Sequence, residues 1–214
     1  MRTILYIHGM GGGGDSRIPR LLRERFAGTD FRCIVRTYDF DPETGHAQIA
    51  SWVEELHPDL LIGESLGAVQ ALRIPGIPRL FVSPALGAPD IQARLAWITR
   101  LPGGKALLHR IWRVKEGDRQ PLRFEYDIMK KYTAHWAEAK KVAAEGGYNY
   151  AFFGSRDHYM KWGAVQISLW EELFGKTYAI YEGSHFMEEE YVYSLLIPKI
   201  YEVLGGPAKV LPSE

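Results

Sequence analysis

The strongest constraint on how this chain can fold is a regular alternation of short apolar runs with helical patterns. Six runs rich in β-branched and aromatic residues recur, and most are followed by a turn signal and then a helical pattern. This alternation is typical of βαβ units, in which helices join parallel strands and cover the sheet. The sequence predicts a three-layer α/β fold with a mostly parallel six-stranded sheet, its strands at residues 3–7, 31–37, 59–63, 79–83, 148–153 and 177–181.

Capping residues mark where the helices between these runs should begin. Asp15 or Ser16 is the expected N-cap of a helix that runs to about residue 26. Thr44 is the expected N-cap of the next helix, and a third helix is expected to begin at Ser65. The predicted sheet is therefore connected by helices of ordinary length.

Between residues 87 and 145 the alternation stops. This segment has helical propensity, most clearly at 134–145, and it holds twelve Lys or Arg against seven Asp or Glu. Long segments inside a compact fold usually carry their own helices or a function. We interpret residues 87–145 as a helical cap inserted into one α/β core, formed by residues 1–86 and 146–206, with a C-terminal tail at 207–214.

Composition excludes several classes of protein. Twenty-six basic residues balance twenty-six acidic ones, so no overall field would collect nucleic acid or bind an anionic membrane. A single cysteine, Cys33, cannot form an internal disulfide and is expected to be a buried structural thiol. The apolar run at the start is too short for a signal peptide or membrane span. A cytoplasmic protein that acts on a small molecule is the expectation.

The third predicted strand carries a motif with a chemical reason behind it. It continues into the residues GESLG at positions 63–67, which match the G-x-S-x-G nucleophile elbow. A sharp turn from strand to helix strains the serine backbone, and flanking glycines let neighbouring chain approach closely. The five-letter pattern alone can arise by chance, but its place between a buried strand and a helix favours Ser65 as a nucleophile.

A serine nucleophile needs a general base, and chain order selects among the seven histidines. In this architecture the order is serine, then an acid, then a histidine in the loop after the last strand. His185 occupies that place. Asp157, just past the fifth strand, is the candidate acid that would orient the imidazole and stabilise its protonated form. Glu182 is the alternative acid.

A developing oxyanion needs backbone donors, and the loop after the first strand can provide one of them. This loop reads His8-Gly9-Met10-Gly11. We expect the N–H groups of Met10 and Leu66 to form the oxyanion hole, and His8 to have a structural role.

At these residues the sequence resembles the α/β-hydrolase superfamily, and more narrowly the small bacterial esterases of the YqiA type, whose first strand also leads into His-Gly. The resemblance covers the chain outside residues 87–145. It implies a serine esterase that hydrolyses a small-molecule ester or thioester through an acyl-enzyme, with water as second substrate and with no cofactor or metal. The sequence departs from the family pattern in its unusually long glycine run at residues 11–14.

The predicted cap is expected to lie over the elbow and to select the substrate. It is rich in aromatic residues and arginines, and Trp97, Trp112, Arg113 and Tyr126 are the candidate substrate-binding residues. Arginines in this position can pair with an anionic group of a substrate. The alternative is that the aromatic rings only dock the cap and the arginines are solvated.

Two other functions remain open from the sequence. Gly9, Gly11 and Gly14 also satisfy G-x-G-x-x-G, and Asp39 ends the second strand, as in a Rossmann-type dinucleotide-binding oxidoreductase. A hydrolase fold that binds a partner without catalysis is the other alternative. The sequence predicts no metal site, because His185 has no second histidine at ligand spacing.

Overall fold

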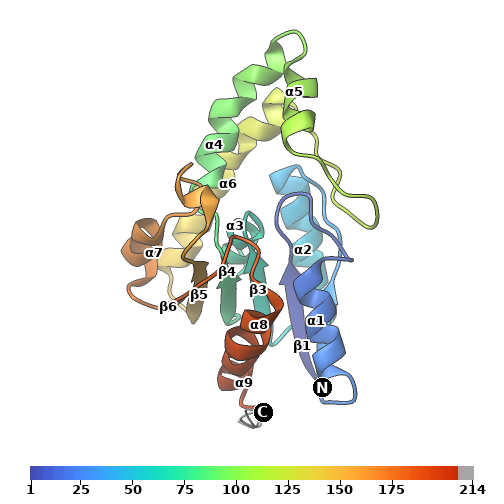
Figure 1. Cartoon of the computed structure of the whole chain (residues 1–214), viewed down its shortest axis with the longest axis vertical. Coiled ribbons are helices and arrows are strands. Elements are labelled where there is room, and N and C mark those ends of the chain that lie inside the picture. The colour runs from blue at the N-terminus through green and yellow to red at the C-terminus, as the bar shows by residue number, and fades with distance from the viewer. Residues whose placement is uncertain (207–214) are drawn as a thin grey trace.

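The computed structural model describes residues 1–206, and a six-stranded sheet lies at its centre (Figure 1). The strand order is β2-β1-β3-β4-β5-β6, and every neighbouring pair is parallel. The three-layer α/β fold and the six strands are therefore confirmed, with a sheet that is wholly parallel. The predicted tail at 207–214 lies outside the described residues. The strands are β1 (Arg2–Ile7), β2 (Phe31–Val35), β3 (Leu60–Glu64), β4 (Arg79–Val82), β5 (Asn149–Gly154) and β6 (Tyr178–Tyr181).

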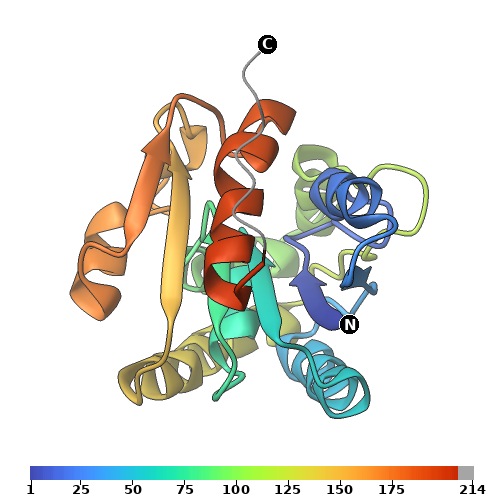
Figure 2. The same cartoon turned by 90° about the horizontal axis from the view of Figure 1, so that it is seen from below.

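Helices cover both faces of the sheet, as Figure 2 shows with α1 and α9 on one side and α2 and α6 on the other. No helix of the described chain is both long and apolar enough to cross a membrane. The helices are α1 (Arg17–Phe26), α2 (Pro42–Leu56), α3 (Gly67–Leu72), α4 (Ala88–Leu95), α5 (Gly104–Ile111), α6 (Tyr126–Ala144), α7 (Ile167–Phe174), α8 (Glu189–Tyr191) and α9 (Ile197–Leu204), the last two joined by a π-helical turn (Val192–Leu196).

Two apolar cores hold these layers together. Successive strand residues point to opposite faces, so Leu5 and Ile7 of β1 pack into the core shared with α2, α3, α6 and α7. Ile4 and Tyr6 pack into the core shared with α1 and α9. All four side chains are almost fully buried. The sheet is thereby fixed from both sides, which gives the loops at its carboxyl edge a rigid base.

The segment between β4 and β5 rises above the carboxyl ends of the strands and returns to the sheet (Figure 1). It climbs through α4, a 3-10 turn and α5, and it comes back through a long coil and α6. The second half of α6 packs into the same core as the sheet, through Trp136, Ala139 and Ala143. Residues 87–145 are therefore continuous with the core packing.

Three helices begin at residues other than those expected. The side chain of Asp41, not Thr44, caps α2 by accepting the N–H groups of Glu43 and Thr44, and Pro42 fits the first helical position. α3 begins at Gly67, because Ser65 has a positive φ that a right-handed helix cannot contain. The last difference is in α6, which starts eight residues before the predicted 134, since burial against α4, α3 and α2 extends it.

Candidate active site

Ser65 stands at a sharp turn between β3 and α3. Its φ is +51°, in the left-handed region that residues with a Cβ avoid. Three backbone hydrogen bonds hold it there: its N–H donates to the Val82 carbonyl at 2.9 Å, and its carbonyl accepts from Ala68 and Ala85 at 3.1 and 3.0 Å. The neighbouring strand and the helix together therefore impose the conformation that presents the hydroxyl.

The two glycines of the motif are required by close packing. A Cβ at Gly63 would lie 2.9 Å from the Cα of Ala68, and one at Gly67 would overlap the carbonyl oxygens of Ile7 and His8. A Cβ at Gly9 would come 2.9 Å from the Cβ of Ser65. The loop after β1 therefore lies directly beside the serine, as an oxyanion loop must.

Ser65, His185 and Asp157 form one hydrogen-bonded series. The Nε2 atom of His185 lies 2.9 Å from the Ser65 hydroxyl, and its Nδ1 atom lies 2.7 Å from Oδ2 of Asp157. Asp157 and His185 are buried, whereas Ser65 is partly exposed. The carboxylate accepts the Nδ1 proton, which leaves Nε2 as the acceptor for the serine proton. The structure brings together the three residues that chain order had selected.

Asp157 is held in place by the turn that follows it. The other carboxylate oxygen of Asp157 accepts the N–H of Tyr159 at 2.8 Å, and the Tyr159 ring packs 4.5 Å from the imidazole of His185. Glu182, the alternative acid, instead pairs with Arg156 at the surface. Tyr159 and the exposed Phe186, whose ring also contacts His185, were missed in the sequence, although both adjoin predicted residues.

Hydrogen bonds hold the loop that carries His185 on both sides of this residue. Arg17, at the start of α1, donates from one guanidinium nitrogen to the carbonyls of Phe186, at 2.9 Å, and of Met187. The Glu188 carboxylate accepts the N–H of Ser184 at 3.0 Å. The position of the imidazole is therefore fixed by ordered contacts immediately before and after it.

The two predicted oxyanion donors lie on the chain segments that flank Ser65. Met10 follows Gly9, and Leu66 directly follows the serine. Within residues 1–206, the N–H groups of Met10 and Leu66 take part in no hydrogen bond. A donor left unpaired in this way is what an oxyanion hole requires.

His8 has a structural role in the loop after β1. It is fully buried, its ring stacks on Tyr38 with centroids 4.3 Å apart, and its Nδ1 atom lies 2.8 Å from the Gly9 carbonyl. Burial lowers the pKa of His8 to about 4. A neutral imidazole therefore braces Gly9 without reaching toward the serine.

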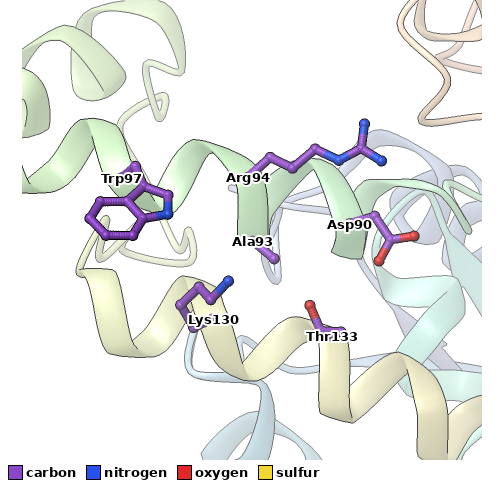
Figure 3. A pocket seen from close by; sticks show the side chains of 6 residues that line it. All are labelled: Asp90, Ala93, Arg94, Trp97, Lys130 and Thr133. Carbon is purple, nitrogen blue, oxygen red and sulfur yellow. The ribbon is translucent and has the colours of Figure 1, made fainter.

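The predicted substrate-binding aromatic residues lie in residues 87–145, which form an arch above the sheet. Trp97 and Tyr126 pack edge to face, and the Arg100 guanidinium lies 3.5 Å above the Tyr126 ring. Trp112 packs against Phe124. Trp97 also lines an open hollow of about 460 Å³ between α4 and α6, which includes none of Ser65, Asp157 and His185. Figure 3 shows its lining side chains: Asp90, Ala93, Arg94, Trp97, Lys130 and Thr133.

The arginines of the arch have different environments. Arg119 pairs with Asp15 at 2.6 Å and Arg123 with Asp39 at 2.8 Å, so these two attach the coil after α5 to the core. Arg113 is exposed. Its neighbour Val114 comes within 3.5 Å of the position of a Cβ at Gly11. Of the four predicted substrate-binding residues, Arg113 is thus next in sequence to a residue that lies close to the oxyanion loop.

The residues that suggested dinucleotide or metal chemistry have other partners. Asp118 lies against Gly13 and Gly14, where a Cβ would overlap it, and an acidic side chain there disfavours a pyrophosphate. Asp39, the expected ribose ligand, binds Arg123. Within the described chain, no three His, Cys, Asp or Glu side chains are placed to share a metal ion. Cys33 is buried, and burial raises the pKa of its thiol to about 12.

Comparisons with known proteins show the family of the chain. The family model described as "Alpha/beta hydrolase family" matches residues 4–202. Among curated proteins, the sequence has no significant match.

Solved structures share the fold over nearly the whole chain. A monoacylglycerol lipase of Paleococcus ferrophilus is 19% identical, with a TM-score of 0.63, and the match covers 95% of this chain and 94% of that one. Est1E of Butyrivibrio proteoclasticus is 13% identical, with a TM-score of 0.64 and coverage of 95% and 88%. Mouse alpha/beta hydrolase domain-containing protein 10 is 14% identical, with a TM-score of 0.58 and coverage of 95% and 89%.

Proposed function

The chain belongs to the alpha/beta hydrolase family, and from that premise we propose that it is a serine esterase that hydrolyses a carboxylic ester or thioester of a small molecule. The single observation that carries the proposal is the hydrogen-bonded series from Asp157 through His185 to Ser65, at 2.7 and 2.9 Å. We propose further that it is a small esterase of the YqiA type, because its first strand leads directly into His8-Gly9.

The first half of the reaction forms an acyl-enzyme. The Ser65 hydroxyl oxygen attacks the ester carbonyl carbon while its proton passes to Nε2 of His185. Asp157 stabilises the imidazolium that results. Negative charge develops on the former carbonyl oxygen, where the N–H groups of Met10 and Leu66 can donate to it. The intermediate then collapses, and the leaving group departs with the proton from Nε2.

The second half releases the acid. Water gives a proton to Nε2 of His185 and attacks the acyl carbon, and the same two N–H groups hold the new oxyanion. The Ser65 oxygen leaves as the alkoxide and recovers its proton from the imidazolium. Atoms balance as ester plus water to acid plus alcohol, or thiol for a thioester.

The substrate class rests on chemistry and on the similar structures together. A monoacylglycerol lipase and carboxylesterases are among the solved structures that share this fold. Ser, His and Asp in this order are suited to acyl transfer, and a buried Asp157 keeps the histidine in the tautomer that accepts the serine proton. Ser65 is partly exposed, and the proposal concerns esters and thioesters of small molecules.

Fluorophosphonate labelling tests the proposal, because only an activated serine attacks such a phosphorus centre at useful rates. We expect intact-mass spectrometry to show a single adduct, and peptide mapping to place it on Ser65. Hydrolysis of p-nitrophenyl esters of graded chain length should be lost in Ser65→Ala. Ser155, which lies at the surface after β5, provides the control variant Ser155→Ala.

Two outcomes would contradict the proposal. Labelling that persists in Ser65→Ala would place the nucleophile elsewhere. A folded wild-type protein that is neither labelled nor active on any ester would instead favour a hydrolase fold that serves only for binding.

A further inference from the structure

The loop that carries Met10 is a single tight turn. The N–H of Gly12 donates to the Gly9 carbonyl at 2.9 Å, and Gly11 has a φ of +70°. A four-residue turn with a positive φ at its third residue only is a type II turn. Its central peptide joins Met10 to Gly11, and a type I turn of the same residues would differ by a flip of that peptide. The orientation of this one peptide therefore decides the shape of the proposed oxyanion loop.

Gln120, which comes from the coil between α5 and α6, binds this turn at two points. Its side-chain oxygen accepts the N–H of Gly11 at 3.1 Å, and its own N–H donates to the Gly12 carbonyl at 2.7 Å. Its side-chain nitrogen donates to the Tyr38 carbonyl at 3.1 Å, which fixes which end of the amide faces Gly11. The residue is 1% exposed. A buried side chain more than a hundred residues away thus holds the central peptide of the turn.

The last two glycines of the long run are explained by the same coil. A Cβ at Gly13 would overlap the backbone of Asp118 and Arg119, and one at Gly14 would overlap the side chain of Asp118. Asp118 is itself fixed, since the Thr37 hydroxyl donates to its carboxylate at 2.6 Å. Glycine is therefore required at 13, where the backbone of the coil carrying Gln120 lies on the loop, and a side chain at 14 would have to displace the Asp118 carboxylate.

We propose that Gln120 is a positioning residue for the oxyanion hole. It accepts the Gly11 N–H and so holds the Met10–Gly11 peptide in the type II orientation. A flip would turn the Met10 carbonyl oxygen toward the Gln120 side-chain oxygen, and the two oxygens would repel each other. It would also change the conformation of Met10, whose N–H is the proposed donor. The inference rests on the proposed function, and it makes the inserted segment part of the catalytic arrangement through this contact.

Kinetics of Gln120→Ala test the inference. We expect kcat for p-nitrophenyl esters to fall roughly 10- to 100-fold, less than the loss of a whole donor, with KM within about 2-fold of wild type. The affinity of a boronic acid, which forms a tetrahedral adduct at the serine, should fall in parallel. The acid limb of the pH profile of kcat/KM should not move, because Asp157 and His185 are untouched. Unchanged kcat, or a change in KM alone, would overturn the inference.

Hydrogen exchange gives a second readout that does not depend on turnover. In Gln120→Ala the amide of Gly11 loses its acceptor, so deuterium uptake of a peptide spanning residues 8–16 should become faster. Uptake equal to that of wild type would overturn the positioning role even in an inactive protein. Failure of Ser65 labelling in wild type would, by contrast, concern only the proposed function.

Gly13→Ala disturbs the same contact between loop and coil by a change in the loop. Gly13 is not in the left-handed region, so alanine can adopt its backbone angles, but the added Cβ must displace the coil at Asp118. We expect a fall in kcat like that of Gln120→Ala, and a double variant no worse than either one, since both break one contact. Fully additive losses would contradict a shared cause. This variant also serves if Gln120→Ala does not fold.

Gln70→Ala is the matched control. Gln70 is a buried glutamine whose amide donates to a main-chain carbonyl, that of Pro42, at 3.0 Å. Its loss should lower stability without lowering kcat or changing exchange at residues 8–16. An equal fall of kcat in Gln70→Ala would show that any loss of a buried amide has this effect, and it would overturn the specific role of Gln120.

Discussion

Single residues carry the proposed chemistry, and their surroundings hold each of them in place. Ser65 holds a positive φ that costs about 1–2 kcal/mol for a residue with a Cβ, and three backbone hydrogen bonds offset that cost. His185 is placed between a carboxylate and the serine hydroxyl, and Arg17 holds the carbonyls that follow it. The site is thus pre-arranged, with little left to be ordered when a substrate binds.

Asp157→Asn should lower kcat steeply, by about 10³- to 10⁴-fold, with the fold intact. An asparagine amide can donate to Nδ1 of His185, which favours the tautomer that no longer accepts the serine proton. His185→Ala removes the base itself and should lower kcat by a comparable factor. Steady-state kinetics with a p-nitrophenyl ester and far-UV circular dichroism measure both effects.

The controls for this prediction are Asp127→Asn and His158→Ala. Asp127 is exposed in the first turn of α6, and His158 is exposed with its ring 6.3 Å from that of His185. Neither makes a hydrogen bond to the serine or its base in residues 1–206. If His158→Ala were inactive and His185→Ala active, the role given to the loop after β6 would be wrong.

Ser65, Asp157 and His185 could be selected from the sequence because each follows a recognisable strand and their order is diagnostic. Gln120 could not. Its partner Gly11 is distant in the chain, and nothing in the residues around Gln120 distinguishes it from a solvated glutamine. The glycine run was visible, but the reason for its last two residues, the approach of Asp118, required the folded structure.

Among the elements, the arch formed by residues 87–145 was foreseen as helical, but its details were not. Propensity located the end of α6, whereas its first two turns depend on burial of Met129 and Tyr132. The start of α2 was misplaced because Thr44 and Asp41 are both good caps, and only the fold shows which one has helical N–H groups in reach. Tertiary contacts thus decided the boundaries that local sequence left open.

Residues 87–145 also lead to a prediction about substrate choice. Arg113 is exposed and lies next to Val114, which approaches the oxyanion loop. An acyl ester that carries a carboxylate should therefore have a higher kcat/KM than its neutral isostere, and added salt should reduce the advantage, because exposed charges are screened. Paired rate measurements at low and high salt measure it.

Arg113→Gln should remove most of that advantage, whereas Arg110→Gln on α5, also exposed, should keep it. Arg119 and Arg123 are unsuitable controls, because their ion pairs with Asp15 and Asp39 attach the coil to the core. Equal rates for charged and neutral esters at low salt would leave residues 87–145 without an electrostatic role in selection.

At the scale of the whole molecule, the parallel sheet assembles the site. Carboxyl ends of parallel strands meet at one edge, with neighbouring strands about 5 Å apart. Ser65 follows β3, Asp157 follows β5 and His185 follows β6, in the order β1-β3-β4-β5-β6. Met10 follows β1, beside β3. Residues distant in sequence therefore reach one another only because every strand runs in the same direction.

The same burial that makes the fold rigid should make it sensitive to acid. His8 and His135 are fully buried, and the pKa of each is lowered to about 4, by burial first and, at His135, by the positive charge of Arg73 as well. An unfolded histidine titrates near 6.5. Between about pH 6.5 and 4 the unfolded chain thus binds more protons than the folded one, so the free energy of unfolding must fall as the pH falls.

His135→Asn should make that fall shallower. The Arg73 guanidinium donates to Nδ1 of His135 at 2.6 Å, and an asparagine oxygen can accept in its place without titrating. Each histidine contributes up to roughly 3 kcal/mol of the loss between pH 6.5 and 4. Urea unfolding at pH 7, 6 and 5 should therefore give His135→Asn a smaller slope of stability against pH than wild type, even if the variant is less stable at pH 7. His57→Asn, at the exposed end of α2, should keep the wild-type slope. A slope unchanged in His135→Asn would mean that this histidine is already protonated in the folded protein near pH 6.5, and that acid sensitivity has another origin.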